Sequence, residues 1–187
     1  PMKSPIVLLF PMVQGTGAGI AILWEVEMKI CMGADHGGFV LKETLKEFIE
    51  QELGHQVMDM GCHNKDSVDY PDFAFMVACA VSEGRCDLGI MVDGAGIGSA
   101  MVANRVPKVR AAFCHDLYTV KNSREHNHAN LLTLGGQTLG PGHAKEMVKT
   151  WLATPLGQGR HQRRVDKIMA VEERFLEAAA KIGERIR

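Results

Sequence analysis

The sequence predicts an α/β protein, with a three-layer, doubly wound (Rossmann-like) fold around a five-stranded parallel sheet. Short, continuously apolar segments alternate along the chain with longer segments whose apolar residues recur at helical spacing. This alternation is typical of parallel strands that helices cover on both faces. The composition agrees, because 20 glycines and an aromatic content of only 6% fit an α/β protein better than a β-sandwich.

The individual elements follow from local signals in chain order. The apolar runs predict strands at Met28–Gly33, Gln56–Met60, Leu88–Val92, Val109–Phe113 and Leu131–Leu134. The first helix is expected to bury Val40, Leu41, Leu45, Phe48, Ile49 and Leu53 and to end at Gly54. Five later helices are expected. The first runs from after Pro71 to near Gly84, the second ends at Asn104, and the third runs from a cap at Asp116 to about Glu125. The last two cover about residues 141–153 and 162–184.

The length of 187 residues corresponds to one domain with a modest surplus. The surplus lies at the N-terminus, so we expect an extension over residues 1–27 and the functional domain over residues 28–187. In the extension, the apolar runs Ile6–Phe10 and Gly19–Trp24 are broken by polar and glycine residues, which argues against a membrane span. Gly15–Gly19 permits a nucleotide-binding alternative, but the third small residue of that fingerprint is missing.

Charge and cysteine content exclude several classes of protein. Lys and Arg total 21 against 22 Asp and Glu, so the formal net charge is -1 and bulk basicity cannot support nucleic-acid binding. The five cysteines are odd in number and form no CxxC pair, which argues against a disulfide framework or a zinc ribbon. A reducing compartment fits best, and we expect a cytoplasmic protein.

Two polar residues, Asp35 and His36, lie just beyond the end of the first predicted strand. In doubly wound folds, ligands bind at the carboxyl ends of the strands. Asp35 can accept hydrogen bonds from sugar hydroxyls, and His36 can contact a phosphate or move a proton. The alternative is that Asp35 only caps the following helix.

A glycine-rich loop, Gly94–Ser99, follows the third predicted strand. Glycines at alternate positions allow backbone N–H groups to converge on an anion at a helix N-terminus. Such a site suits a phosphate or a developing enediolate oxygen, although a tight strand–helix turn would need the same glycines. Asp93 stands at the mouth of this loop, where a carboxylate is better explained as a base than as a cap.

Two further polar segments lie later in the chain. Residues 123–130 are rich in donors, and His126 and His128 stand two apart, but no third metal ligand has convincing spacing. Arg160 and Arg164 are four residues apart and share one face if helical, which suits a phosphate. The alternatives are a polar loop that caps backbone groups and a solvated basic face.

Together, in this order, these segments resemble the ribose-5-phosphate isomerase type B and galactose-6-phosphate isomerase family. The matching stretches are Gly33–Phe39, Asp69–Pro71, Gly94–Asn104, Ser123–Asn127 and Arg160–Val165. The resemblance covers roughly Met28 to Glu173 and leaves residues 1–27 unexplained.

The resemblance implies an aldose–ketose isomerase that acts on a sugar phosphate without metal or cofactor. The substrate it implies most directly is ribose 5-phosphate, which ring opening and a cis-enediolate proton transfer convert to ribulose 5-phosphate. It also implies a homodimer or a dimer of dimers, with the active site at the subunit interface and the C-terminal helix packed on the second subunit. Neither nucleic acid nor membrane is implied as a partner.

Roles carry over only to matching positions. The resemblance implies that His126 and Asp35 open the sugar ring, that Asn127 binds a hydroxyl, and that Tyr70 lines the sugar. The backbone of Gly94, Ala95, Gly96, Ile97, Gly98 and Ser99 would hold the enediolate oxygens, and His36, Arg160 and Arg164 would hold the phosphate.

The chain departs from the family pattern where the base is expected. Many members have a cysteine base at the position of Asp93, and others have a glutamate at the position of Ser99. Ala95 replaces a hydroxyl-bearing residue, and Gln137 replaces an arginine of the phosphate site. Asp93 is the obvious substitute base. These departures leave a tetrose or hexose phosphate, or a sugar-phosphate binding protein without catalysis, as alternatives.

Overall fold

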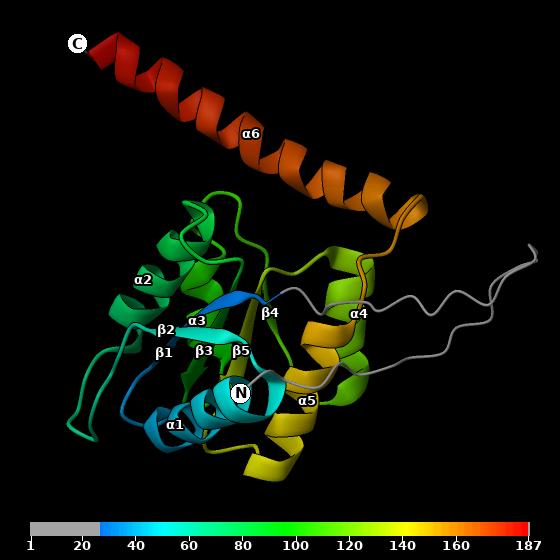
Figure 1. Ribbon diagram of the computed structural model, residues 1–187. Helices are drawn as coiled ribbons and strands as arrows, with labels where there is room; N and C mark the ends of the chain where they lie inside the picture. Colours follow the sequence, from blue (N-terminus) through cyan, green and yellow to red (C-terminus); the bar gives the residue numbers. More distant parts are fainter. Residues whose placement is uncertain (1–26, 187) are drawn as a thin grey trace, which may run out of the picture.

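The computed structural model describes residues 27–186 and contains the predicted sheet. Its five parallel strands are β1 (Lys29–Ala34), β2 (Gln56–Asp59), β3 (Leu88–Asp93), β4 (Ala111–Phe113) and β5 (Leu131–Gly135). Their order across the sheet is β2-β1-β3-β5-β4, so β5 lies between β3 and β4 (Figure 1). The apolar runs and glycine motif expected in residues 1–26 lie outside the described residues.

Helices follow the strands in the predicted alternation. They are α1 (Phe39–Phe48), continued by the π-helical turn η1 (Ile49–Leu53), then α2 (Tyr70–Ser82), α3 (Ile97–Ala103), α4 (Leu117–Asn127), α5 (Pro141–Ala153) and α6 (Arg160–Ile186). The predicted stop at Gly54 is confirmed, because this residue adopts the left-handed conformation with φ of 74°. The predicted cap is also confirmed, since the Asp116 side chain accepts a hydrogen bond from the backbone N–H of Thr119 at 2.7 Å.

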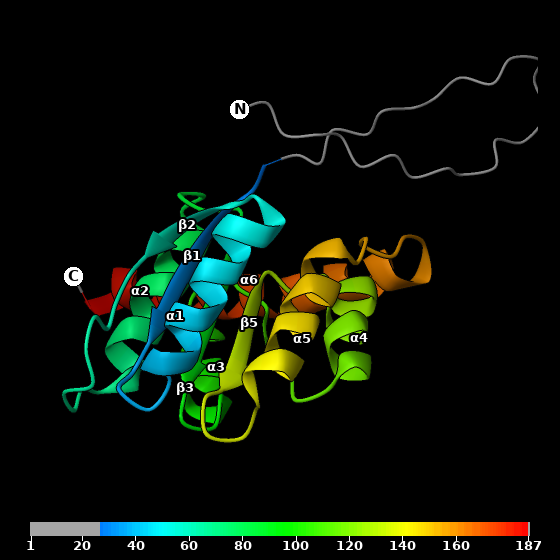
Figure 2. The same ribbon diagram turned by 60° about the horizontal axis from the view of Figure 1, so that its bottom comes forward.

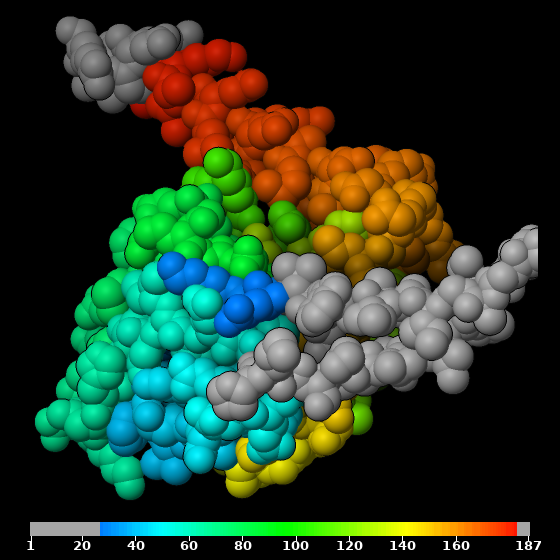
Figure 3. Space-filling view, viewed as in Figure 1, coloured from blue at the N-terminus to red at the C-terminus, as the bar shows by residue number. Residues whose placement is uncertain are grey.

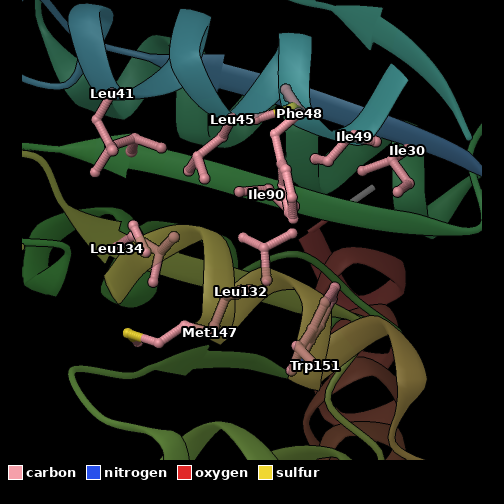
Figure 4. Packing of buried hydrophobic residues seen from close by; sticks show 14 of the residues in the cluster. Ile30, Leu41, Leu45, Phe48, Ile49, Ile90, Leu132, Leu134, Met147 and Trp151 are labelled. Carbon is pink, nitrogen blue, oxygen red and sulfur yellow. The ribbon is translucent and has the colours of Figure 1, made fainter. Parts of the chain in front are cut away.

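Two apolar clusters sandwich the sheet. On one face, α1, α4 and α5 pack against one side of the strands, with Leu45 and Trp151 fully buried (Figure 4). On the other face, α2 and α3 bury Val77 and Ala103 against the opposite side of the strands. This doubly covered sheet is the architecture that the continuous apolar strands predicted.

Two predicted details were wrong. Val40 is 58% exposed, because the buried stripe of α1 runs through Leu41 and Leu45 and leaves Val40 on its outer side. Strand β4 begins at Ala111, two residues later than predicted. Side chains hold the backbone just before the strand. The Asn104 Oδ1 atom accepts from the Ala111 N–H at 2.9 Å, and the Asn130 Oδ1 atom accepts from the Arg110 N–H at 2.7 Å.

A partly buried ion-pair cluster holds β2 against α1. The Nζ atom of Lys42, which is fully buried, lies 2.8 Å from both carboxylate oxygens of Asp59, and Lys46 lies 2.8 Å from one of them. Burial alone would raise the pKa of Asp59, but hydrogen bonds from both lysines and from the Gly61 N–H outweigh it and lower this pKa to about 2. Because the Gly61 carbonyl accepts from the Ala34 N–H, this cluster also fixes the carboxyl end of β1.

The long helix α6 leaves the body of the molecule. Its second half projects beyond the other elements (Figure 3). Its exposed large apolar residues between positions 160 and 182 are Ile168, Val171, Phe175, Leu176 and Ile182. Within residues 27–186, each helix is too short or too polar to cross a membrane.

Candidate active site

Asp35 and His36 follow β1 at the carboxyl edge of the sheet. The Asp35 Oδ1 atom accepts a hydrogen bond from the Gly38 N–H at 2.9 Å, so the side chain does hold the turn into α1. The residue is buried but retains 8% exposure. The Nδ1 atom of His36 lies 3.2 Å from backbone atoms of Val68, which leaves Nε2 as the ring nitrogen available to a ligand.

The glycine loop wraps around the carboxylate of Asp93. The Asp93 Oδ1 atom accepts from the N–H groups of Ala95, at 2.8 Å, and Gly96. Its Oδ2 atom accepts from the Ser99 N–H at 3.0 Å and from the Ser99 hydroxyl. The loop N–H groups that remain for an oxyanion are therefore those of Gly94, Ile97 and Gly98, a smaller set than the sequence predicted.

Side chains from two other elements close this edge. The ring of Tyr70, at the start of α2, lies over the Cα atom of Gly98, where an added Cβ atom would lie 2.5 Å from the ring. Gln137, which follows β5, lies beside Gly37 and Gly94 and is tied to the loop by its N–H, which donates to the Gly94 carbonyl at 3.1 Å. Asp35, His36, Tyr70, Asp93 and Gly94–Ser99 thus form one group, which we call the carboxyl-edge cluster.

The second group of predicted residues lies around the end of α4 and the start of α6. The ring of His126 stacks on that of His161, with centroids 4.0 Å apart and an angle of 15° between the planes. Asn127 is exposed at the last residue of α4. Arg160 and Arg164 are exposed on the first turns of α6, where their spacing places them on one face. His126, Asn127, Arg160 and Arg164 form what we call the amino-edge cluster.

His126 and His128 do not act as a pair. His128 is the left-handed residue that ends α4, and its Nε2 atom lies 2.7 Å from the Gly157 carbonyl oxygen. The surroundings of His126 are instead His161 and Asn122. Among the described residues there is no group of three His, Cys, Asp or Glu side chains placed to bind a metal.

The two clusters lie at opposite ends of the sheet within one chain. Helix α4 starts beside the carboxyl end of β4 and returns over 11 residues, about 16 Å, to the edge where β5 begins. Figure 2 shows the loops after β1, β3 and β5 at one end of the sheet and the start of α6 at the other. A sugar phosphate bound to one cluster is therefore out of reach of the other cluster of the same chain.

Comparison with known proteins places this arrangement in a family. The model of the ribose/galactose isomerase family matches residues 30–168. The chain belongs to the ribose/galactose isomerase family. Its members are isomerases, and the matched range runs from the second residue of β1 to the first turns of α6.

Individual relatives agree with this assignment. The chain is 40% identical to ribose-5-phosphate isomerase B of Escherichia coli, over 78% of this chain and 97% of that protein. It is 36% identical to D-erythrulose-4-phosphate isomerase of Pectobacterium atrosepticum, over 75% of this chain and 93% of that protein. The structure of ribose-5-phosphate isomerase B from Clostridium thermocellum superposes with a TM-score of 0.77 at 46% identity, over 79% of this chain and 99% of that chain.

Two site features are missed or undervalued by sequence reasoning. The sequence marks Gln137 only as a departure from the family pattern, although its position just after a strand end identifies it as a pocket residue. Asn122 is not singled out by any motif, although it stands four residues before His126 on α4 and its side chain lies 2.8 Å from that ring. In the second case, the i, i+4 spacing is the signal that could have found it.

Proposed function

We propose that this isomerase interconverts an aldose phosphate and a ketose phosphate, with ribose 5-phosphate and ribulose 5-phosphate as its substrate pair. The observation that carries the proposal is the carboxyl-edge cluster, in which two carboxylates, Asp35 and Asp93, flank a loop with free backbone N–H groups. A carboxylate beside such donors suits proton transfer next to a carbonyl, because the donors stabilise the enediolate oxygens that form.

In the proposed reaction, the ring opens first. Asp35 accepts the proton of the C1 hydroxyl, while His126 donates a hydrogen bond to the ring oxygen. As the bond between C1 and the ring oxygen breaks, the proton held by Asp35 passes to that oxygen, so no proton is gained or lost overall. Asp93 then removes the C2 proton and returns it to C1, while the C2 hydroxyl proton passes to the C1 oxygen. The N–H groups of Gly94, Ile97 and Gly98 hold the charge on the intermediate.

The hydrogen bonds to Asp93 indicate which of its oxygens takes the proton. Three of its four donors are backbone N–H groups fixed by the loop, whereas the fourth is the Ser99 hydroxyl. A hydroxyl can rotate about its single bond and release its acceptor. Oδ2, which the Ser99 hydroxyl contacts, is therefore the oxygen that can exchange this donor for a substrate proton.

The remaining roles require a second copy of the chain. His126, Asn127, Arg160 and Arg164 of one subunit would meet the carboxyl-edge cluster of its partner, with the two arginines and the partner's His36 on the phosphate. This pairing supplies the positive charge that the carboxyl-edge cluster lacks.

Exposed apolar surface supports this pairing. Phe113 lies against Gly96 of the loop, and Ile97 and Met101 on α3 and Leu117 and Tyr118 at the start of α4 are exposed, the last by 77%. A second apolar surface lines a groove of about 740 Å³ between α6 and the segment before β4, with Val106 and Phe175 on opposite sides. Exposed apolar surface of this kind is typical of an interface. A homodimer, or a dimer of dimers, in which α6 packs on the second subunit would cover both.

The direct test is turnover of tetrose, pentose and hexose phosphates under identical conditions, with aldose and ketose quantified by NMR. We expect ribose 5-phosphate to have the highest kcat/KM. The relative that acts on D-erythrulose 4-phosphate makes a tetrose phosphate the second candidate. Absence of conversion with every sugar phosphate would overturn the proposed function.

A further inference from the structure

A chain of hydrogen bonds on α4 ends at the imidazole of His126. The Nδ2 atom of Asn127 donates to the Oδ1 atom of Asn122 at 3.3 Å, and the Nδ2 atom of Asn122 lies 2.8 Å from the Nδ1 atom of His126. Because the Asn122 oxygen already accepts from Asn127, its NH₂ group is the end that faces the histidine. An amide NH₂ can only donate, so Nδ1 of His126 accepts and carries no proton.

A second histidine ring lies against His126. The ring of His161 lies parallel to it at 4.0 Å, which covers one face of His126. Burial, followed by the nearby His126, Arg160 and Arg164, lowers the pKa of His161. The stacking holds the plane of the His126 ring, so Nε2, the ring nitrogen that Asn122 does not contact, keeps a fixed direction.

We propose that Asn122 is a positioning residue that holds His126 in the tautomer with the proton on Nε2. His126 then presents a hydrogen-bond donor to a substrate oxygen, and not a lone pair that would take a proton from it. This inference rests on the proposed function for the role of His126 at the sugar ring, but the tautomer itself is a property of the free protein. A neutral imidazole used as a donor is a known way to polarise an oxygen during isomerisation.

Long-range ¹H–¹⁵N spectra of the full chain labelled with ¹⁵N test the tautomer directly. Spectra are recorded at about pH 8, where histidines are mostly neutral, and His126 is assigned by the signals that disappear in His126→Ala. We expect the wild-type protein to show the proton of His126 on Nε2. In Asn122→Asp, the carboxylate accepts from Nδ1, so the proton should move to Nδ1. A wild-type His126 with its proton on Nδ1 would overturn the inference, as would an unchanged pattern in a folded Asn122→Asp.

Kinetics connect the tautomer with the reaction. Asn122→Asp should lower kcat for ribose 5-phosphate roughly 10- to 100-fold while KM changes less than about twofold, because a donor is lost at the reacting oxygen. Lys121→Ala, an exposed neighbour on the same helix, is the matched control and should retain wild-type kcat. Wild-type kcat in Asn122→Asp with a reversed tautomer would refute the catalytic importance of the tautomer. Failure of the proposed function can be told apart from failure of this inference. In that case the wild-type protein would show the Nε2 tautomer but would not isomerise any sugar phosphate.

Discussion

The hydroxyl of Ser99 donates a hydrogen bond to the carboxylate of Asp93, and both side chains are buried, with exposures of 0% and 4%. The two positions are those at which other family members are expected to have a cysteine or a glutamate base. Here they are occupied by a carboxylate and the hydroxyl that holds it. The chain therefore has a hydrogen-bonded pair, Asp93 and Ser99, where a single base is expected.

Replacing Asp93 with Asn should abolish isomerisation. Loss of a general base typically lowers the rate by about 10²- to 10⁴-fold, and the amide also brings an NH₂ group against the loop N–H donors. We expect kcat to fall by at least about 100-fold and stability by about 1–3 kcal/mol, with ribose 5-phosphate binding retained in calorimetry. The control is Glu173→Gln, which changes an exposed carboxylate on α6 and should leave kcat and stability unchanged. Full activity in Asp93→Asn would refute its role as the base.

Mixing two inactive variants should restore activity. Each site is proposed to combine the carboxyl-edge cluster of one subunit with the amino-edge cluster of another. A dimer of one Asp93→Asn subunit and one His126→Ala subunit then contains one intact site. Random reassortment of subunits should then recover about a quarter of wild-type activity, measured after mild unfolding and refolding of the mixture. A mixture that stays inactive, although mass spectrometry shows mixed dimers, would place each site within one chain.

A methyl group on Gly98 should displace Tyr70. The added Cβ atom would lie 2.5 Å from a rigid ring, so Gly98→Ala should cost about 1–3 kcal/mol of stability and lower kcat/KM. In a Tyr70→Ala background the same change should cost much less, which a double-mutant cycle measures. Gly142→Ala is the control, because a Cβ atom there meets no atom within 4 Å. Equal costs in both backgrounds would show that the ring is not what Gly98 accommodates.

Asp59 should make stability depend on pH in the acid range. Its pKa is about 2 in the folded protein against 3.8 for the free side chain, so it stabilises the fold above about pH 4. This contribution, about 2 kcal/mol, is lost as the pH falls toward 2. Asp59→Asn should lower the urea midpoint at pH 7, and its difference from the wild type should shrink between pH 4 and 2. A constant difference across this range would contradict the assignment.

Thiol reagents should inhibit this isomerase only weakly. Burial raises the pKa of Cys31, Cys62, Cys79 and Cys114, so little reactive thiolate is present at neutral pH. We expect slow modification by iodoacetamide, followed by mass spectrometry, with activity largely retained. Rapid inactivation that parallels labelling of one cysteine would show that a thiol takes part in the reaction.

The sequence by itself determines the elements and half of the site. Apolar runs, the cap at Asp116 and the stop at Gly54 are local signals, and each reports the conformation of its own segment. Because ligands bind at the carboxyl ends of parallel strands, the positions of Asp35 and Asp93 at the ends of two strands are enough to predict that both lie at one edge of the sheet.

Only the tertiary structure decides the order of strands and the surroundings of each functional group. The place of β5 between β3 and β4 depends on how distant segments pack, which no local pattern encodes. In the same way, His126 is far from Asp93 in its own chain because α4 carries it back across the sheet. The hydrogen bonds that engage Asp93 and orient His126 depend on atoms a few ångströms apart, so they exist only once the chain has folded.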